Sequence, residues 1–256
     1  MRKIGEILKI GLPIMLGQAC VIILAFADNI MIGWHSVDEL AASSFVNNIL
    51  NLLIMTELGF AAGMTPIIGS HNGRGDVASV GLTLRNGLVV NGLIGLASVV
   101  LLAVVYALLG HFGQEPELLP LIRPYFVIVG ISTLFSLGFN TLKQFTDGIC
   151  RPVVSMVFLL LGNVVNIFGN WVLIYGKLGF PEMGLVGAGI STLFSRILIF
   201  AAFLLYILFS KSLRQYARAI KEAVLSLAEM KSIFTVGYPV AIQMALETSS
   251  FTFAAV

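Results

Sequence analysis

The chain has 256 residues, of which 58% are hydrophobic and 11% are charged. A soluble domain carries about 45–50% apolar and about 25% charged residues, so the composition excludes a soluble domain and indicates an integral membrane protein. The net charge of +2 comes without a basic run beside stacking aromatic residues, which argues against nucleic-acid binding. Cys20 and Cys150 lie far apart, with no CxxC or Cys/His spacing, so neither a disulfide framework nor a metal site is expected.

Six segments are long and apolar enough to cross a bilayer, which takes roughly 20 residues. In chain order they cover residues 8–33, 41–69, 84–110, 118–142, 153–175 and 184–209. A seventh begins near Ile233 and is still apolar at Val256. We therefore predict an all-α integral membrane protein, with a six-span lobe over 1–210, a linker over 211–231 and the incomplete first span of a second lobe over 232–256.

The distribution of positive residues predicts the orientation, because positive loops stay in the cytoplasm. Twelve of the 15 lysine and arginine residues fall on one side of the predicted spans: Arg2, Lys3, Lys9, Arg74, Arg85, Lys143, Arg151, Lys211, Arg214, Arg218, Lys221 and Lys231. The opposite side keeps Lys177 and, near a span end, Arg123. The amino terminus is therefore predicted to be cytoplasmic.

The first span has an alternative interpretation as a cleaved signal peptide, since residues 1–3 carry positive charge and residues 25–27 form an A-x-A motif. Cleavage before Asp28 would destroy the span. The charge pattern permits both interpretations, and we favour the uncleaved span because of the polar site and the resemblance described below.

The linker region has apolar residues at helical spacing, with basic residues between them. The apolar positions are Leu213, Tyr216, Ala217, Ile220, Val224 and Leu227. We predict an amphipathic helix on the cytoplasmic surface that links two bundles. An ordinary solvated linker is the alternative.

A short motif at the start of span one returns near the start of span seven. Gly11-Leu12-Pro13 recurs as Gly237-Tyr238-Pro239, and neighbouring apolar positions match at the same offset. Since six spans separate the two copies, both enter the membrane from the same side, as in a parallel repeat. The chain is thus predicted to be the first half of a twelve-span protein plus one span of the second half.

Three acidic residues, Asp28, Glu57 and Glu247, lie inside predicted spans, where ionisable groups are functional candidates by default. Asp28 lies roughly 12 Å to the outer side of the middle of span one, at 1.5 Å per residue. Glu57 lies near the middle of span two, and Arg196 is its possible partner. A structural ion pair and a role in transport both remain open for this pair.

Span five places Asn163, Asn166 and Asn170 on one helical face, because they are spaced i, i+3 and i+7. Span six brings hydroxyl groups to the same outer half, on Ser191, Thr192 and Ser195. With Asp28 these groups would hold a proton or a hard cation such as sodium. The alternative is that each amide only bonds a neighbouring helix, worth about 0.6 kcal/mol.

Several motifs together resemble one transporter family. They are Gly11-Leu12-Pro13, Asp28-Asn29-Ile30-Met31-Ile32-Gly33, Leu40-Ala41-Ala42, Thr65-Pro66-Ile67-Ile68-Gly69, Leu173-Ile174-Tyr175-Gly176, and Gly184-Leu185-Val186-Gly187-Ala188-Gly189-Ile190-Ser191-Thr192. In order and spacing the chain resembles the multidrug and toxic compound extrusion (MATE) transporters, closest to the NorM-like branch. The resemblance covers the amino-terminal lobe and the first helix of the second lobe.

The resemblance implies a cation-coupled antiporter that exports amphipathic, often cationic, drugs by alternating access between two six-helix lobes. It implies a coupling-cation site at Asp28, surrounded by Asn166, Asn170 and Thr192. Some relatives carry an aspartate at the position of Asn170, so here Asp28 is the only carboxylate of that cluster. Glu247 matches an acid of a possible second-lobe cation site.

The implied coupling ion is a proton or sodium, and no other cofactor is expected. The expected partners are small amphipathic molecules, membrane lipid and the missing second lobe, and not nucleic acid. The expected location is the plasma membrane, as a multi-pass protein of a bacterial inner membrane.

Two other interpretations are kept as alternatives. A lipid-linked oligosaccharide flippase of the related superfamily would need several deep positive residues for pyrophosphate, and Arg196 is the only one here. A non-transporting fragment is the second, because half of such a fold cannot alternate against itself. We predict no catalytic site, since the spans contain no catalytic pair of acids and no Ser/His arrangement for an intramembrane protease. The string Gly73-Arg74-Gly75-Asp76 has the GxGD pattern, but it lies in a hydrophilic loop without a second catalytic acid.

Overall fold

A computed structural model describes the backbone of residues 2–254 and the side chains of residues 11–250. Within this part the chain is almost entirely helical and has no strand. The helices are α1 (Arg2–His35), α2 (Val37–Ala62), α3 (Met64–Gly73), α4 (Val77–Leu108), α5 (Leu119–Gly148), α6 (Pro152–Ile174), α7 (Gly184–Phe209), α8 (Arg214–Glu222) and α9 (Leu227–Ala254), with short 3-10 turns η1 (Leu109–His111) and η2 (Lys211–Leu213). The predicted all-α fold class is confirmed.

Six segments of the described chain are long and apolar enough to cross a membrane, and they match the six predicted spans. The second of them consists of α2 and α3, which meet at Gly63, so the break falls within the span. α9 is helical where a seventh span was predicted to begin, but polar residues such as Gln243 and Glu247 keep it outside this set of six. The protein is a multi-pass membrane protein.

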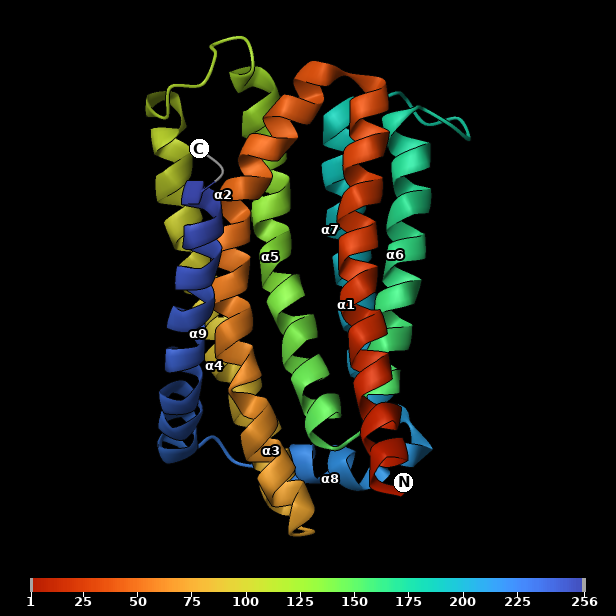
Figure 1. The fold of residues 1–256 in the computed structure, drawn as a ribbon, viewed down its shortest axis with the longest axis vertical. Coiled ribbons are helices and arrows are strands. Elements are labelled where there is room, and N and C mark those ends of the chain that lie inside the picture. Colours follow the sequence, from red (N-terminus) through yellow and green to blue (C-terminus); the bar gives the residue numbers. More distant parts are fainter. Residues whose placement is uncertain (1, 255–256) are drawn as a thin grey trace.

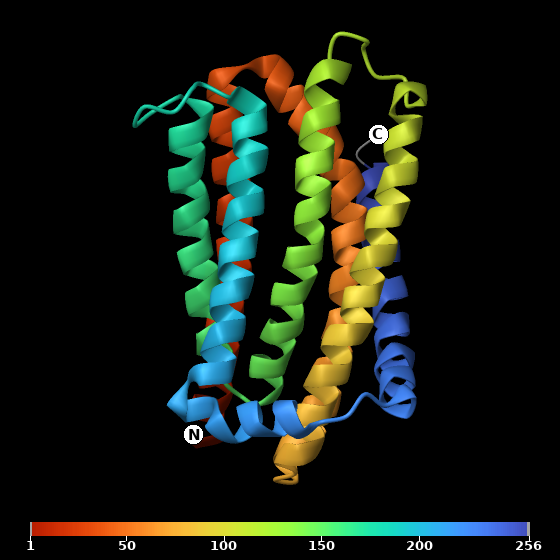
Figure 2. The ribbon, with the colours of Figure 1, turned by 180° about the vertical axis from the view of Figure 1, so that it is seen from behind.

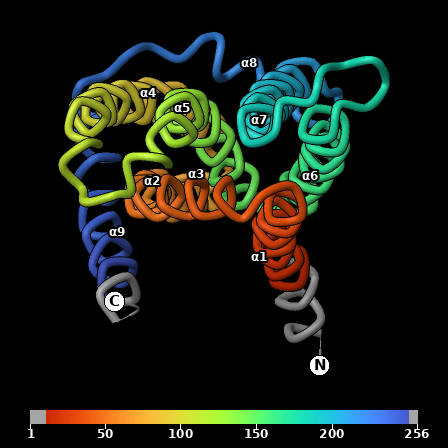
Figure 3. The backbone as a smooth tube through the Cα atoms, turned by 90° about the horizontal axis from the view of Figure 1, so that it is seen from above, coloured from red at the N-terminus to blue at the C-terminus, as the bar shows by residue number. Residues whose placement is uncertain are grey.

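The long helices stand side by side as a bundle (Figures 1 and 2). Seen from above, α1, α6 and α7 form one group, and α2, α4 and α9 lie on the other side of α5 (Figure 3). We call the end that carries α8 the linker end and the end that carries residues 112–118 and 175–183 the loop end. Each end has its own buried apolar cluster, around Phe145 and Phe203 at the linker end and around Phe126 at the loop end.

The linker helix is shorter than predicted. Only Arg214–Glu222 forms α8, residues 223–226 are not helical, and α9 already begins at Leu227. α8 is amphipathic as predicted, and it buries its apolar side against the bundle, where Tyr216 donates a hydrogen bond to Asn72 at 2.6 Å. It crosses the linker end on the outside of the bundle (Figures 2 and 3).

Two side chains of α4 hold the segment between α8 and α9. Arg85 donates to the carbonyl oxygens of Ile220, Lys221 and Ala223, which are the carbonyls that a helix end leaves without partners. Asn86 donates to the carbonyl of Val224 at 3.1 Å and accepts from the amide of Ser226 at 2.8 Å. α4 therefore anchors the connection to α9.

Replacing Arg85 and Asn86 with alanine should release this connection without disrupting the spans, because the lost hydrogen bonds go to residues 220–226, apart from the bond of Asn86 to the Leu82 carbonyl of its own helix. Amide hydrogen exchange in that segment should rise by about one to two orders of magnitude, if each of the two side chains contributes about 1 kcal/mol. Arg74→Ala, at an exposed turn of the same end, serves as the control. Unchanged exchange at 220–226 in the double variant would contradict the assigned anchoring role.

Small residues let α9 cross α2 at close range. A Cβ atom added to Gly59 would overlap the backbone of Val240 and Ala241, and one added to Gly63 would overlap the backbone of Gly237. Close approach through small residues is the usual means of association between membrane helices. Gly237 belongs to the second copy of the repeated motif and packs on Phe60 of α2, whereas an added Cβ atom at Gly11 in the first copy would meet no heavy atom of the described residues within 4 Å.

Candidate functional site

The predicted polar residues lie where α1, α6 and α7 pack together. Asp28 comes from α1, Asn166 and Asn170 from α6, and Thr192 from α7. The side chain of Asp28 is partly buried, whereas both amides are buried. Asn166 and Asn170 are four residues apart and so share one face of α6.

A continuous chain of hydrogen bonds joins these four residues. Asn170 Nδ2 donates to Asp28 Oδ1 at 2.6 Å and to Asn166 Oδ1 at 3.3 Å. Asn166 Nδ2 in turn donates to Thr192 Oγ1 at 3.2 Å. The structure therefore brings together the four residues that the family resemblance assigned to one site.

The backbone of α6 lies close to α7 at this point. A Cβ atom on Gly169 would overlap the side chain of Ser191, so glycine is needed for this approach. Ser191 Oγ uses the proximity to donate to the carbonyl of Asn166 at 2.8 Å, and Ser195 Oγ lies 3.5 Å from Asn166 Nδ2. Both hydroxyls restrict the position of Asn166.

One oxygen at the site has no partner. Both interactions of Asn170 use its amide nitrogen, and its Oδ1 is buried without a hydrogen bond in the described part of the chain. A buried acceptor without a partner costs about 1–3 kcal/mol. A cation or a hydrogen-bond donor that bound to this oxygen would remove that cost. A carboxylate and a free amide oxygen are the kind of ligands that a hard cation prefers.

The donor set does not fit a multivalent metal. Among the described residues, no group of three or more histidine, cysteine, aspartate or glutamate side chains could hold a metal ion. Asp28 supplies the only negative charge of the hydrogen-bonded cluster. A single carboxylate suits a proton or a monovalent cation better than a divalent one.

Asn163 does not join this cluster. Its Nδ2 donates to the backbone carbonyl of Cys20 at 2.7 Å and so ties α6 to α1. For Asn163 the structural alternative, an interhelical hydrogen bond, therefore holds.

Glu57 and Arg196 do not form the direct ion pair that the sequence left open. In the part of the chain that the structure describes, no salt bridge joins them, and Arg196 donates instead to Ser132 of α5 at 2.7 Å. Glu57 is buried, and among the described residues its Oε1 has no hydrogen-bond partner. Arg196 interacts electrostatically with both Asp28 and Glu57.

Glu247 lies apart from the Asp28 cluster. It is exposed on α9, where it accepts a hydrogen bond from Gln243 at 2.9 Å. Its expected role in a second-lobe site would need groups from outside the described residues, so that role stays a prediction.

Two features near the site were missed by the sequence interpretation. The buried Tyr125 of α5 interacts electrostatically with Asp28 and Arg196. His35, the last residue of α1, bridges Glu39 at 2.7 Å and Glu182 at 2.9 Å. The interaction of Tyr125 could have been predicted by counting its depth in span four. The contact between His35 and Glu182 could not, because no sequence pattern links two residues that are 147 positions apart.

The GxGD string is explained by local structure. Gly75 has a φ of 73°, and Asp76 caps the start of α4 by accepting from Ser79 N at 3.0 Å and Ser79 Oγ at 2.6 Å. The hydrogen bond from the Ser79 side chain, then that from its amide, holds the pKa of Asp76 below its usual value. Helix capping accounts for this aspartate.

Comparisons with known proteins agree on one family. The family model described as MatE matches residues 13–172. The multidrug resistance protein NorM of Photobacterium profundum is 30% identical over 98% of this chain and 55% of its own length. NorM of Vibrio cholerae is 26% identical over the same shares, so the chain spans about half the length of the curated relatives it matches.

Solved structures show the same fold. The eukaryotic MATE transporter AtDTX14 matches with a TM-score of 0.87 at 18% identity, over 99% of this chain and 55% of that one. A transporter of the MOP superfamily from Pyrococcus furiosus matches with a TM-score of 0.82 at 22% identity, over 93% of this chain and 52% of that one. The fold is therefore that of one half of a MATE transporter.

Proposed function

Because this chain belongs to the MatE family of membrane transporters, we propose that it forms the amino-terminal lobe of a multidrug efflux antiporter and carries one site for the coupling cation. The observation that supports this most directly is the Asp28–Asn170 contact of 2.6 Å beside the partnerless Oδ1 of Asn170. A carboxylate inside a span is costly and is retained where ions or protons are handled.

The coupling cation is a proton or sodium, bound by the Asp28 carboxylate. The free Oδ1 of Asn170 supplies a further oxygen, and Asn166 holds Asn170 in place through their hydrogen bond of 3.3 Å. Thr192 of α7 is the last residue of the hydrogen-bonded series and accepts from Asn166. Arg196, which interacts with Asp28 without touching it, weakens the attraction for the cation enough that it can leave again.

Transport couples to this site through the two access states of the whole protein. A bound cation shifts the equilibrium only by the difference in its affinity for those states. Asp28 joins α1 to α6 through its hydrogen bond, so neutralising it changes how these two helices are held. The substrates are amphipathic, often cationic compounds, in keeping with the multidrug resistance named for the relatives.

The proposed location is the bacterial inner membrane, with the linker end in the cytoplasm. The linker end carries Arg74, Arg85, Lys143, Arg151 and the basic residues of α8, whereas Lys177 lies at the loop end. This asymmetry supports a cytoplasmic linker end by the positive-inside rule.

Removing the amide of Asn170 tests the site without removing its charge. In proteoliposomes of the intact protein, the cation concentration at half-saturation of dye export should shift by about tenfold in Asn170→Ala, the effect of losing one interaction with a charged group. The shift should be upward for sodium, which loses the Oδ1 ligand, and downward for protons, because Asn170 Nδ2 no longer stabilises the charged carboxylate. The maximal rate should be largely kept.

Asn163→Ala is the matched control, because this amide lies on the same helix and bonds the α1 backbone instead of Asp28. Its cation dependence should stay that of the parent protein. An equal shift in both variants, or a shift in neither, would show that Asn170 does not belong to a cation site.

A further inference from the structure

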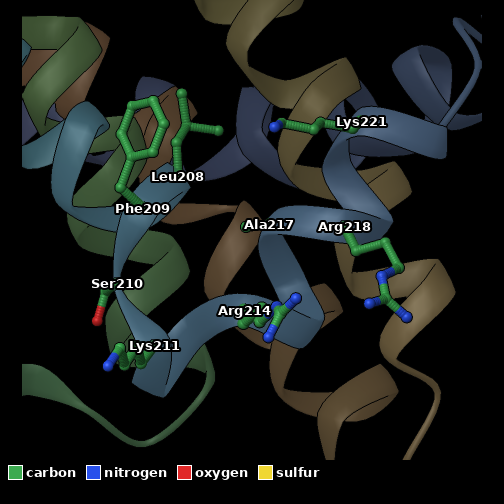
Figure 4. Close-up of a pocket in the computed structure, with 8 residues that line it drawn as sticks. All are labelled: Leu208, Phe209, Ser210, Lys211, Arg214, Ala217, Arg218 and Lys221. Carbon is green, nitrogen blue, oxygen red and sulfur yellow. The ribbon is translucent and has the colours of Figure 1, made fainter.

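A basic groove lies at the linker end, away from the Asp28 cluster. It has a volume of about 460 Å³ and lies between the end of α7, η2 and α8 (Figure 4). Its lining consists of Leu208, Phe209, Ser210, Lys211, Arg214, Ala217, Arg218 and Lys221. Four of these eight side chains are cationic and none is acidic.

The four cations have no ion-pair partner in the described part of the chain. The three ion pairs found there join His35 to Glu39, His35 to Glu182 and Lys143 to Asp147, all elsewhere. All four basic residues are exposed, while Tyr216 and Ala217 between them are buried against the bundle. The outward side of α8 therefore presents positive charge that the protein itself does not neutralise.

Exposed apolar side chains flank this basic surface on both sides. Phe209 before α8 is 75% exposed, and Leu227 after it is 85% exposed, with Val224 and Leu225 also exposed. Large apolar groups left in water are unfavourable, by about 25 cal/mol for each Å². Such groups beside lysine and arginine are the pattern of a segment at the boundary between lipid headgroups and acyl chains.

The position of α8 agrees with that boundary. α8 runs across the linker end on the perimeter of the bundle, next to α4 and α7, and not beneath its centre (Figures 2 and 3). α7 reaches the groove directly from a membrane-spanning segment that ends at Phe209. Lipid headgroups lie at this height around a span.

We propose that this groove binds the headgroup of an anionic phospholipid. Lys211, Arg214, Arg218 and Lys221 contact the headgroup phosphate, and Phe209 lies along the acyl chains. A soluble phosphate would satisfy the cations alone, but it would leave the neighbouring apolar residues in water, so the combination favours a lipid. This site is independent of the proposed coupling-cation site.

Photocrosslinking tests the proposal in the intact protein. Benzoyl-phenylalanine replaces Phe209, the protein is placed in nanodiscs with equal amounts of phosphatidylglycerol and phosphatidylcholine, and the crosslinked lipid is identified by mass. Phosphatidylglycerol should be enriched at least about fivefold, since each Lys or Arg near an anionic surface contributes about that factor. The double variant Arg214→Gln/Arg218→Gln should lose most of this enrichment.

Two further variants separate charge from folding. Arg214→Lys/Arg218→Lys keeps both charges and should keep the enrichment. Arg74→Gln/Lys231→Gln removes two exposed charges of the same end outside the groove and should change nothing. Equal crosslinking of both lipids in the parent protein, or enrichment that survives Arg214→Gln/Arg218→Gln, would overturn the proposal. If millimolar inorganic phosphate abolished the enrichment of phosphatidylglycerol, the lipid would be rejected as the occupant of the groove, and a soluble anion would take its place.

Discussion

Asp28→Asn should reduce cation-driven dye export by the intact protein to the level of liposomes without protein. Asparagine is close to aspartate in shape, and its side-chain oxygen can still accept the hydrogen bond from Asn170 Nδ2. The fold and the binding of substrate should therefore persist. The variant lacks the only negative charge of the hydrogen-bonded cluster, so neither a proton nor sodium can be exchanged there.

Asp38→Asn is the matched control for this experiment. Asp38 is an exposed acid in the first turn of α2, outside the cluster, and its removal should leave export unchanged. Dye binding measured without a gradient separates lost coupling from lost folding. Export that retains its rate and its cation dependence in Asp28→Asn would refute the proposed coupling site.

Gly59→Val should destabilise the intact protein more than any conservative change in the Asp28 cluster. The added side chain would overlap the backbone of Val240 and Ala241, which cannot move aside as the end of a flexible side chain can. Overpacking of this kind costs about 1–3 kcal/mol, and here it also separates two membrane helices held by close contact. A lower thermal unfolding midpoint in detergent is the expected result.

Gly92→Val is the control for Gly59→Val, because it places the same residue in a membrane helix. An added Cβ atom at Gly92 has no heavy atom within 4 Å, and Gly92 is exposed on α4. Its unfolding midpoint should stay near that of the parent protein. Equal destabilisation by both substitutions would show that helix propensity, and not the α2–α9 crossing, determines the effect.

Local composition and periodicity predicted the six spans and placed the amides of span five on one face, whereas the set of Asp28, Asn166, Asn170 and Thr192 came from the family resemblance. Mean hydropathy over about 20 residues reports a span directly, and helical spacing placed Asn166 and Asn170 on one face. Counting from the span midpoints then brought Asp28 and Thr192 to a similar depth. The structure joins these four residues through hydrogen bonds of 2.6–3.3 Å.

Depth alone does not determine which helices touch, and this limited the other predictions. Asn163 shares the face of Asn166 but meets the backbone of Cys20, one turn closer to the linker end. Glu57 and Arg196 have opposite charges inside spans two and six, yet Arg196 is held by Ser132 of a third helix. Charge and spacing could not distinguish a pair in contact from two groups on neighbouring helices.

By itself, the sequence determined the membrane class, the six spans and the shared helical face of Asn166 and Asn170, since these follow from the hydropathy and helical period of short stretches. Only the tertiary structure decided that α9 packs on α2 through glycines, that α4 anchors the linker, and that η2 and α8 together turn four cations outward beside exposed apolar residues. The physical reason is that helix association in a membrane depends on the fit of whole surfaces from distant parts of the chain. No local pattern of residues encodes that fit.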